Sequence, residues 1–456
     1  MENYNGGFVK FRFLLGSLIL CFLAACDDEL SPSPVLEEEL AKQKAIEDSI
    51  AREIAIQDSI AFVHLQDSLA EIARQDSIVR DSLVRDSIMQ DSIRQIAIRD
   101  SIVRDSIVRD SLKQDSIKQV YDLQDSLLQL DVQVAEATIA PRRVGPVGQY
   151  GEMKTGVNAE GVGRIYGSCP AYSTPGNEVQ VRGMSLYWSL IERGTDFYND
   201  EKITWMVDSM RIELIRAAMG VDLNWGRGNY FTDTEKYRAF LDSVIVSAIK
   251  NDIYVIIDYH SHTAHLDPKS SMLFFEYVAQ KWGAYDNVIF EIYNEPTDAR
   301  WNWIKLYAET VIPVIRKYSD NMVIVGSPAW DQTPDLFVKE PVEGENISYS
   351  FHYYAGTHKI SNQGIRAEKA MAGGLSVIVS EWGTINANGD GEVSDRNAEW
   401  QEWVDLHQLS SANWSASSVP EGASAFESTN MELTASGKWL ADNVFSKNPT
   451  SYVKCE

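Results

Sequence analysis

The sequence predicts an α/β protein whose main part is a (β/α)8 TIM barrel, preceded by a low-complexity stalk that is helical or disordered. After Pro141 the composition changes to one rich in Gly and aromatic residues, and all 12 Trp lie between Trp188 and Trp439. In this part short apolar runs alternate with amphipathic stretches, which is the pattern of repeated strand–helix units. Eight such units in about 270 residues fit a closed barrel.

The overall composition excludes two classes of protein. The chain has 456 residues and a formal net charge of -25, so we expect no nucleic-acid partner, which would require a basic surface. Four cysteines are too few for a disulfide-rich scaffold.

Residues 1–26 have the parts of a secretory signal. Lys10 and Arg12 precede an apolar run over 13–23, which is too short for an ordinary transmembrane helix. The run ends in Leu-Ala-Ala-Cys, which resembles the lipobox of bacterial lipoproteins. The resemblance implies cleavage before Cys26, lipidation of its thiol and anchoring to a membrane of the cell envelope, with the outer membrane favoured. An ordinary signal peptide with a chance cysteine is the alternative.

Residues 27–140 form a repetitive stalk, and 35–140 contain neither Gly nor Pro. The tripeptide Asp-Ser-Ile/Leu recurs there, mostly every five residues. Five residues turn a helix by about 140°, so the apolar side chains spiral around it and form no single core face. Correctly oriented i,i+4 pairs such as Asp76 with Arg80 favour a helix. We predict a solvated spacer that is helical or partly disordered; a coiled coil that self-associates or binds a wall component is the alternative.

Residues 141–178 are expected to be a hairpin-rich preamble that covers the bottom of the barrel, and 179–446 the catalytic domain. Apolar runs such as 254–257 are continuous rather than alternating, as expected of parallel strands buried on both faces. The predicted strands are 179–185, 213–219, 254–260, 288–294, 322–327, 347–353, 376–381 and 411–415. Predicted helices include 236–250, 272–282, 301–318 and 397–407. An open doubly wound sheet is less favoured, because no Gly-rich phosphate loop follows the first strand.

Two carboxylates end predicted strands on opposite sides of the barrel mouth. Glu295 follows the fourth strand and Glu381 ends the seventh. Catalytic residues of such barrels gather at the C-terminal strand ends. A pair of carboxyl groups, one donating a proton and one attacking the anomeric carbon, is the machinery of glycoside hydrolysis.

Six motifs at successive strand ends resemble glycoside hydrolase family 5, and most closely its cellulase-type endo-β-1,4-glucanases. They lie at 215–219, 255–260, 292–296, 352–358, 380–383 and 413–415, and the resemblance covers roughly 145–445. It implies a retaining endo-β-1,4-glucanase that hydrolyses cellulose-like β-glucan without a cofactor. The Asp-Lys element frequent in this family after the last strand is replaced by Ser415 to Pro420. A β-mannanase or xyloglucanase, a non-catalytic glycan-binding lipoprotein, and an envelope anchor built around the stalk therefore stay open.

The resemblance also implies roles for single residues. Glu295 is the expected general acid/base, with a raised pKa, and Glu381 the expected nucleophile. Arg216 and Tyr354 would favour the ionised nucleophile. Asn294 is expected to bind the sugar 2-hydroxyl, and His260 and His352 to lie around the cleaved sugar. Trp188, Trp330, Trp382 and Trp414 are the candidate substrate-binding platforms, with packing as the alternative role for each.

His260, His262 and His265 crowd together, at spacings that could in principle hold zinc. They follow a strand with no Cys nearby and no His-Glu-x-x-His pattern, and retaining glycoside chemistry needs no metal. We therefore expect no metal site.

Cys169 and Cys455 are the cysteines left after signal removal and lipidation of Cys26. The cell envelope outside the cytoplasm is oxidising. The start and end of a closed barrel lie close together, so we expect a disulfide between these two cysteines.

Overall fold

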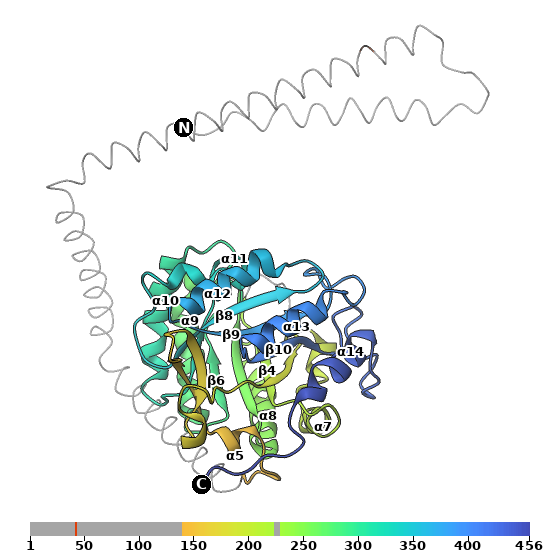
Figure 1. Ribbon diagram of the computed structural model, residues 1–456. Helices are drawn as coiled ribbons and strands as arrows, with labels where there is room; N and C mark the ends of the chain where they lie inside the picture. Colours follow the sequence, from red (N-terminus) through yellow and green to blue (C-terminus); the bar gives the residue numbers. More distant parts are fainter. Residues whose placement is uncertain (1–41, 43–138, 223–228) are drawn as a thin grey trace, which may run out of the picture. The chain divides into compact units, whose positions relative to one another are not determined.

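The computed structural model describes residues 42, 139–222 and 229–456 (Figure 1). The predicted signal segment with Cys26, and nearly all of the predicted stalk, lie outside these residues. Within the described residues, no helix combines the length and apolar character needed to cross a membrane.

Eight parallel strands close into a barrel, which confirms the predicted fold class. Each strand pairs with its neighbours in sequence, and the last pairs with the first. The strands are β3 (Arg182–Leu186), β4 (Leu214–Gly220), β5 (Tyr254–His260), β6 (Val288–Glu291), β7 (Val323–Val325), β8 (Ile347–Tyr354), β9 (Ser376–Gly383) and β10 (Ser411–Ala416).

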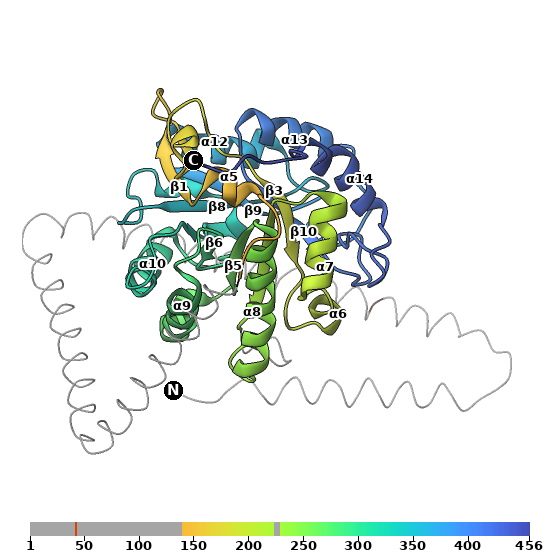
Figure 2. The same cartoon turned by 90° about the horizontal axis from the view of Figure 1, so that it is seen from below.

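Helices lie around the outside of the ring of strands (Figure 2). They are α6 (Glu192–Thr195), α7 (Asp200–Trp205), α8 (Thr234–Asn251), α9 (Pro268–Trp282), α10 (Trp301–Ile315), α11 (Pro328–Asp331), α12 (Ile365–Ala372), α13 (Asn397–Leu406) and α14 (Ala435–Asn443). Helix α9 begins earlier than its periodicity predicted. Asp267 caps it by accepting the Ser270 amide, and Pro268 occupies the first turn, where a missing N–H costs nothing.

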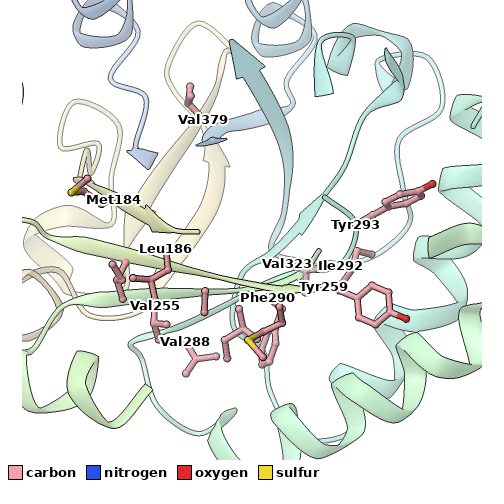
Figure 3. Close-up of a cluster of buried hydrophobic side chains, with 14 of the residues drawn as sticks. Met184, Leu186, Val255, Tyr259, Val288, Phe290, Ile292, Tyr293, Val323 and Val379 are labelled. Carbon is pink, nitrogen blue, oxygen red and sulfur yellow. The ribbon is translucent and has the colours of Figure 1, made fainter. Parts of the chain in front are cut away.

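Alternation along each strand separates two environments. On β4, Ile215 and Ala217 face the helices, whereas Leu214 belongs to a second apolar cluster inside the barrel. Figure 3 shows part of the outer cluster, with Val255, Phe290 and Val323 from neighbouring strands packed together. The inner cluster fills the lower barrel, so polar side chains are left for the upper part of the same inward faces.

The segment before the barrel contains α5 (Pro146–Tyr150) and an antiparallel hairpin of β1 (Met153–Val157) and β2 (Gly163–Gly167). Its apolar side chains Val147, Tyr150, Met153 and Ile165 join the inner cluster. The preamble therefore covers the end of the barrel at which the strands begin.

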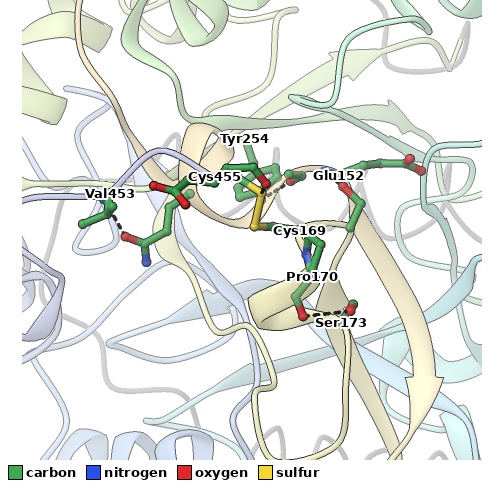
Figure 4. Close-up of a disulfide and its surroundings, with 11 residues drawn as sticks. Glu152, Cys169, Pro170, Ser173, Tyr254, Val453 and Cys455 are labelled. Atoms are coloured by element: carbon green, nitrogen blue, oxygen red, sulfur yellow. Dashed lines mark hydrogen bonds between the residues drawn. A yellow bond between two sulfur atoms is a disulfide. The ribbon is translucent and has the colours of Figure 1, made fainter.

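A disulfide between Cys169 and Cys455 fastens the C-terminal tail to this preamble, with the two Cα atoms 5.9 Å apart (Figure 4). The Cys455 amide also donates to the carbonyl of Gly148 at 2.8 Å. Both ribbon views place the C-terminus beside α5 (Figure 1, Figure 2).

Three strands are shorter than predicted, and one of them is β3, which begins at Arg182 although 179–185 was predicted. β6 ends at Glu291, although the Ile292 amide still donates to the Ile324 carbonyl at 3.0 Å. Beyond that bond the chain leaves the sheet, so Asn294 and Glu295 stand on the loop after β6. β7 is likewise reduced to Val323–Val325.

Candidate active site

A pocket of about 610 Å³ opens at the C-terminal ends of the barrel strands. Its wall includes Glu295 and Glu381, with aromatic side chains and histidines around them. With the exception of Trp382 and Arg216, every non-cysteine site residue predicted from the sequence for the barrel lines this pocket. They are Trp188, His260, Asn294, Glu295, Trp330, His352, Tyr354, Glu381 and Trp414.

Glu381 lies at the floor of the pocket and is held by two donors. Tyr354 donates its hydroxyl to Glu381 Oε1 at 2.7 Å, and Arg216 Nη1 donates to Oε2 at 2.9 Å. The side chain is 5% exposed, so these bonds replace most of its water. Both bonds fix the rotamer of the carboxylate, as a nucleophile requires.

Arg216 itself is fully buried beneath the pocket, in a layer of charged side chains. Its guanidinium contacts Glu291 at 2.6 Å and Asp258 at 2.8 Å, besides Glu381. Nη2 also donates to Asn294 Oδ1 at 2.6 Å, which orients that amide. Burial raises the pKa of Asp258 to about 7, although Arg216 opposes the shift.

Glu295 is enclosed by histidines. His352 Nδ1 lies 3.1 Å from Glu295 Oε1, and His262 Nε2 lies 3.5 Å from Oε2. Burial alone would raise the pKa of Glu295, but the hydrogen bonds to His262 and His352 outweigh it and lower the pKa. The sequence prediction of a raised pKa for Glu295 is therefore wrong, because it did not include the two imidazoles beside the carboxylate.

His260, by contrast, is an uncharged imidazole beside the charged layer. Burial, assisted by Arg216, lowers the pKa of His260 to about 3, so the ring is neutral at physiological pH. Its Nδ1 lies 2.6 Å from Asp258 Oδ2. The ring stacks on Trp414 with a centroid distance of 5.8 Å.

The two pocket carboxylates lie close together. One oxygen of Glu295 and one of Glu381 are within 4.8 Å of each other, with a nitrogen of His352 inside the same limit. Retaining glycosidases hold their carboxyl groups about 5–5.5 Å apart, whereas inverting enzymes leave about 6.5–9.5 Å for a water molecule. The spacing suits direct attack by one carboxylate and protonation by the other.

Residues 172–419 match the profile of the family described as cellulase (glycosyl hydrolase family 5). That segment is more than half of the chain. The chain belongs to glycoside hydrolase family 5.

Family 5 relatives resemble most of the barrel. The chain is 38% identical over 279 residues to endoglucanase Z of Dickeya dadantii (strain 3937), covering 60% of this chain and 63% of that protein. It is 33% identical over 293 residues to cellulase CelDZ1 of a Thermoanaerobacterium species, covering 59% of this chain and 74% of the relative. The chain thus spans a little less than two thirds of endoglucanase Z.

Solved structures give the same assignment. A protein from Cytophaga hutchinsonii is similar with a TM-score of 0.60 and 36% identity, over 66% of this chain and 97% of that one. The catalytic domain of Thermobifida fusca endoglucanase Cel5A is similar with a TM-score of 0.57 and 27% identity, over 65% and 98% of the two chains.

Aromatic side chains form one wall of the family 5 pocket. Trp414, Trp188 and Tyr187 lie together, with the ring centroids of Tyr187 and Trp414 5.0 Å apart. Trp330 stands at the rim and is 49% exposed, so its ring face is open to a ligand. Tyr187 extends this wall, and sequence reasoning did not single it out.

Trp382 does not belong to the pocket, and the prediction that it binds substrate is wrong. Its side chain is fully buried, stacks on Tyr353 at 5.6 Å and meets Trp439 edge-on. Glu381 faces the barrel interior, so the next residue on the strand must face the helices.

Among the described residues, two groups of three potential metal ligands occur: Glu291, Asp331 and His352, and Glu295, His352 and Glu381. In both groups a carboxylate already binds Arg216, at Glu291 in the first and Glu381 in the second. The three histidines weighed from the sequence do not converge as one such group within the described part. His265 Nδ1 turns instead to the Tyr293 hydroxyl at 2.7 Å.

Several pocket or network residues escaped sequence reasoning. Asp258 and Glu291 could have been found, because an acidic residue inside an otherwise apolar strand must have a buried partner. His262 follows His260 by two residues and could have been chosen as a partner of Glu295. Glu421 and Asp331 stand on loops, where no periodicity indicates the direction of a side chain.

Proposed function

We propose that this family 5 protein is a retaining endo-β-1,4-glucanase that hydrolyses cellulose-like β-glucans by double displacement. The approach of Glu295 and Glu381 to within 4.8 Å is the observation that carries the proposal. The names of the relatives support the substrate class, and a variant of the Thermobifida fusca domain has been solved in complex with cellotetraose.

In the first step Glu295 donates its proton to the glycosidic oxygen while a Glu381 oxygen attacks the anomeric carbon. The C–O bond to the leaving sugar breaks, and a glycosyl ester with Glu381 forms. Arg216 and Tyr354 aim the attacking carboxylate. Asn294, held by Arg216, is placed to bind the 2-hydroxyl, a contact that strengthens in the transition state.

In the second step Glu295, now ionised, takes a proton from water as the water attacks the anomeric carbon. The ester bond to Glu381 breaks and the β-anomer leaves. His262 and His352 stabilise the Glu295 carboxylate between the two steps. The aromatic wall of Trp414 and Trp188 supplies an apolar surface for the pyranose ring.

A β-mannanase or xyloglucanase on the same scaffold is the second candidate. The observation that favours it is the loop from Ser415 to Pro420, which lacks the Asp-Lys element frequent in family cellulases. Hydrolysis of a panel of soluble β-glucans, mannans, xylans and xyloglucan by the full chain separates the candidates. A rate on mannan or xyloglucan above that on carboxymethyl cellulose would contradict the glucanase assignment.

Glu381→Gln and Glu295→Gln test the mechanism. We expect each to reduce kcat by at least about 10³-fold while the melting temperature changes little, since both side chains keep their shape. Fresh wild-type product observed by NMR should be the β-anomer. Initial α-anomer, or near-normal hydrolysis by Glu381→Gln, would refute the retaining mechanism. If two independent wild-type preparations hydrolyse none of the glycans, a glycan-binding protein is favoured instead.

We further propose that the enzyme is tethered to the cell envelope by lipid at Cys26, with residues 27–140 as a spacer. The lipobox-like residues before Cys26 support the anchor. Two sequence features support an extended helical or disordered stalk: the absence of Gly and Pro from 35–140 and the Asp-Ser-Ile/Leu repeat. Self-association of the stalk as a coiled coil is the alternative.

A further inference from the structure

Asp331 is a buried carboxylate for which neither step of the proposed mechanism gives a role. It is fully buried, yet it ends a turn whose neighbour Trp330 is on the pocket rim. Its Oδ2 lies 3.4 Å from Nε2 of His352, the ring whose other nitrogen contacts Glu295. Glu295, His352 and Asp331 therefore form one line from the pocket into the barrel wall.

The backbone that places Asp331 is strained. Ala329, Trp330 and Asp331 are three consecutive residues with positive φ, of 59°, 55° and 56°. Left-handed conformations cost such residues on the order of 1 kcal/mol each. The turn is fastened by the Trp330 amide, which donates to the carbonyl of Pro296 at 3.1 Å, next to Glu295. Such strain is kept where the surrounding structure determines it, which includes functional sites.

We propose that Asp331 is a positioning residue for the general acid: its carboxylate accepts the Nε2–H of His352 and leaves Nδ1 as the proton acceptor that faces Glu295. This inference rests on the proposed function. With Nε2 carrying hydrogen, the single proton between Nδ1 and Glu295 Oε1 resides on either atom. When it resides on Glu295, that carboxyl group is the acid that the first step requires.

The other neighbour of Nε2 cannot fix the tautomer. Ser380 Oγ lies 3.0 Å from it, but a hydroxyl donates or accepts equally well, and Ser350 Oγ can exchange roles with it at 2.6 Å. Asp331 in its ionised form can only accept; burial raises the pKa of Asp331 well above its usual range, whereas the charge of the adjacent His352 opposes that shift and favours the ionised form. Burial opposes a charge on His352, but Asp331 and then Glu295 outweigh burial and raise the pKa of His352 to about 9.

Other charged groups surround the same ring. Glu291 and Glu381 have carboxylate oxygens within 4.8 Å of it, and Asp258 and His358 interact with it electrostatically. Asp331 contacts Nε2, and its second oxygen, Oδ1, accepts the Ser327 amide.

The proton balance closes over one turnover. The Glu295 proton moves to the leaving glycosidic oxygen as the bond from Glu381 to the anomeric carbon forms. His352 keeps its Nε2–H throughout. In the second step Glu295 regains a proton from the attacking water as the bond to Glu381 breaks, so the enzyme returns to its starting state.

Asp331→Asn tests the proposal with little change of shape. The amide oxygen must still accept the Ser327 amide, so the NH2 group turns toward Nε2 of His352. Nε2 then has to accept, and the hydrogen moves to Nδ1, which forces Glu295 to be the acceptor. An amide in place of a histidine-orienting aspartate has this consequence in serine proteases.

Leaving-group dependence separates loss of acid catalysis from general damage. For phenyl β-cellobioside, whose leaving group needs protonation, kcat/KM of Asp331→Asn should fall about 10²-fold. For 2,4-dinitrophenyl β-cellobioside, which needs none, it should stay within about threefold. Glu295→Ala gives the reference pattern, and Asp252→Asn is the matched control.

Asp252 is a buried aspartate at the barrel bottom that accepts the amides of Gly145 and Gly148, so its amide variant reports only the cost of the substitution. Equal loss on both cellobiosides, or no loss on either, would overturn the role of Asp331. An inactive wild type would instead overturn the proposed function.

A second measurement reads the tautomer on the wild-type chain itself. In the 15N-labelled full chain, the ring signals of His352 are assigned by comparison with His352→Gln. They should show a hydrogen on Nε2, whether the ring is neutral or cationic. A neutral ring with hydrogen on Nδ1 alone would refute the proposal, whatever the kinetics of Asp331→Asn.

Discussion

Removal of the disulfide between Cys169 and Cys455 should lower the stability of the barrel without lowering its activity. The change is the double variant Cys169→Ser with Cys455→Ser. The bond joins residues 286 positions apart, and it lies at the end of the barrel away from the pocket. Reduction of the wild-type protein should reproduce the effect.

The magnitude follows from the length of the closed loop. The chain-entropy relation gives about 5.5 kcal/mol at 25 °C for a loop of this length, and measured effects more often reach about 2–4 kcal/mol. The tail keeps other bonds to the preamble and barrel base, such as the Tyr452 hydroxyl to Glu213 at 2.8 Å and the Val453 amide to Gln149 at 2.9 Å. We therefore expect a loss of about 3 kcal/mol.

A folded part of roughly 320 residues has an unfolding entropy near 0.7 kcal/mol/K, so a loss of about 3 kcal/mol lowers the melting temperature by about 4–5 °C. Calorimetry of both proteins, with and without reductant, measures this, while hydrolysis at 25 °C checks activity. Reductant should not shift the melting temperature of the double variant. Equal melting temperatures of wild type and variant would show that the bond does not stabilise the fold, and two free thiols in the non-reduced wild type would show that it does not form.

Three further predictions concern different parts of the chain. Burial raises the pKa of Glu213 to about 7, so the folded state keeps a proton that the unfolded state loses near pH 4.5. The stabilisation from this proton is complete below pH 4.5 and is lost, by about 3 kcal/mol, as the pH rises through 7. In Glu213→Gln this pH dependence of the unfolding free energy, measured by urea titration, should be absent. Parallel curves for the two proteins would contradict this. Trp330→Ala removes an exposed ring face of the pocket rim, and the loss of roughly 60 Å² of apolar contact, about 1.5 kcal/mol, should raise KM for cello-oligosaccharides about tenfold with an unchanged melting temperature. An unchanged KM would show that the ring does not bind sugar. Cys26→Ser should move the enzyme from the membrane to the soluble fraction after detergent-free lysis at unchanged turnover; wild-type enzyme in the soluble fraction would exclude the anchor.

The barrel could be predicted because its signals are local. Several strands contain a continuous apolar run, such as 254–257, and the chemistry-bearing residues stand where the strands end, as with His260 and Glu381. The order of the strands then brings these ends together without any knowledge of loop structure. The same reasoning predicted that Cys169 lies near Cys455, since the start and the end of a closed barrel lie close together.

What could not be predicted depends on register and on loops. The pairing of β8 with β9 shifts between Ser350 and His352, so Ser380 and Glu381, although adjacent, both contact inward-facing side chains. Strict alternation allows only one of them to do so. Asp331 reaches His352 because three residues adopt a left-handed turn, which no propensity favours for Ala, Trp or Asp together.

The charged layer under the pocket holds the carboxylate of the proposed nucleophile, Glu381. One guanidinium, that of Arg216, contacts Asp258, Glu291 and Glu381, so it cannot neutralise all three carboxylates. Burial raises the pKa of Asp258 to about 7 and also that of Glu291, in both cases against the effect of Arg216. Burial thus favours the protonated forms of Asp258 and Glu291. Glu381 alone of the three reaches the pocket and accepts a second bond from Tyr354, so its carboxylate is held from two sides for attack on the sugar.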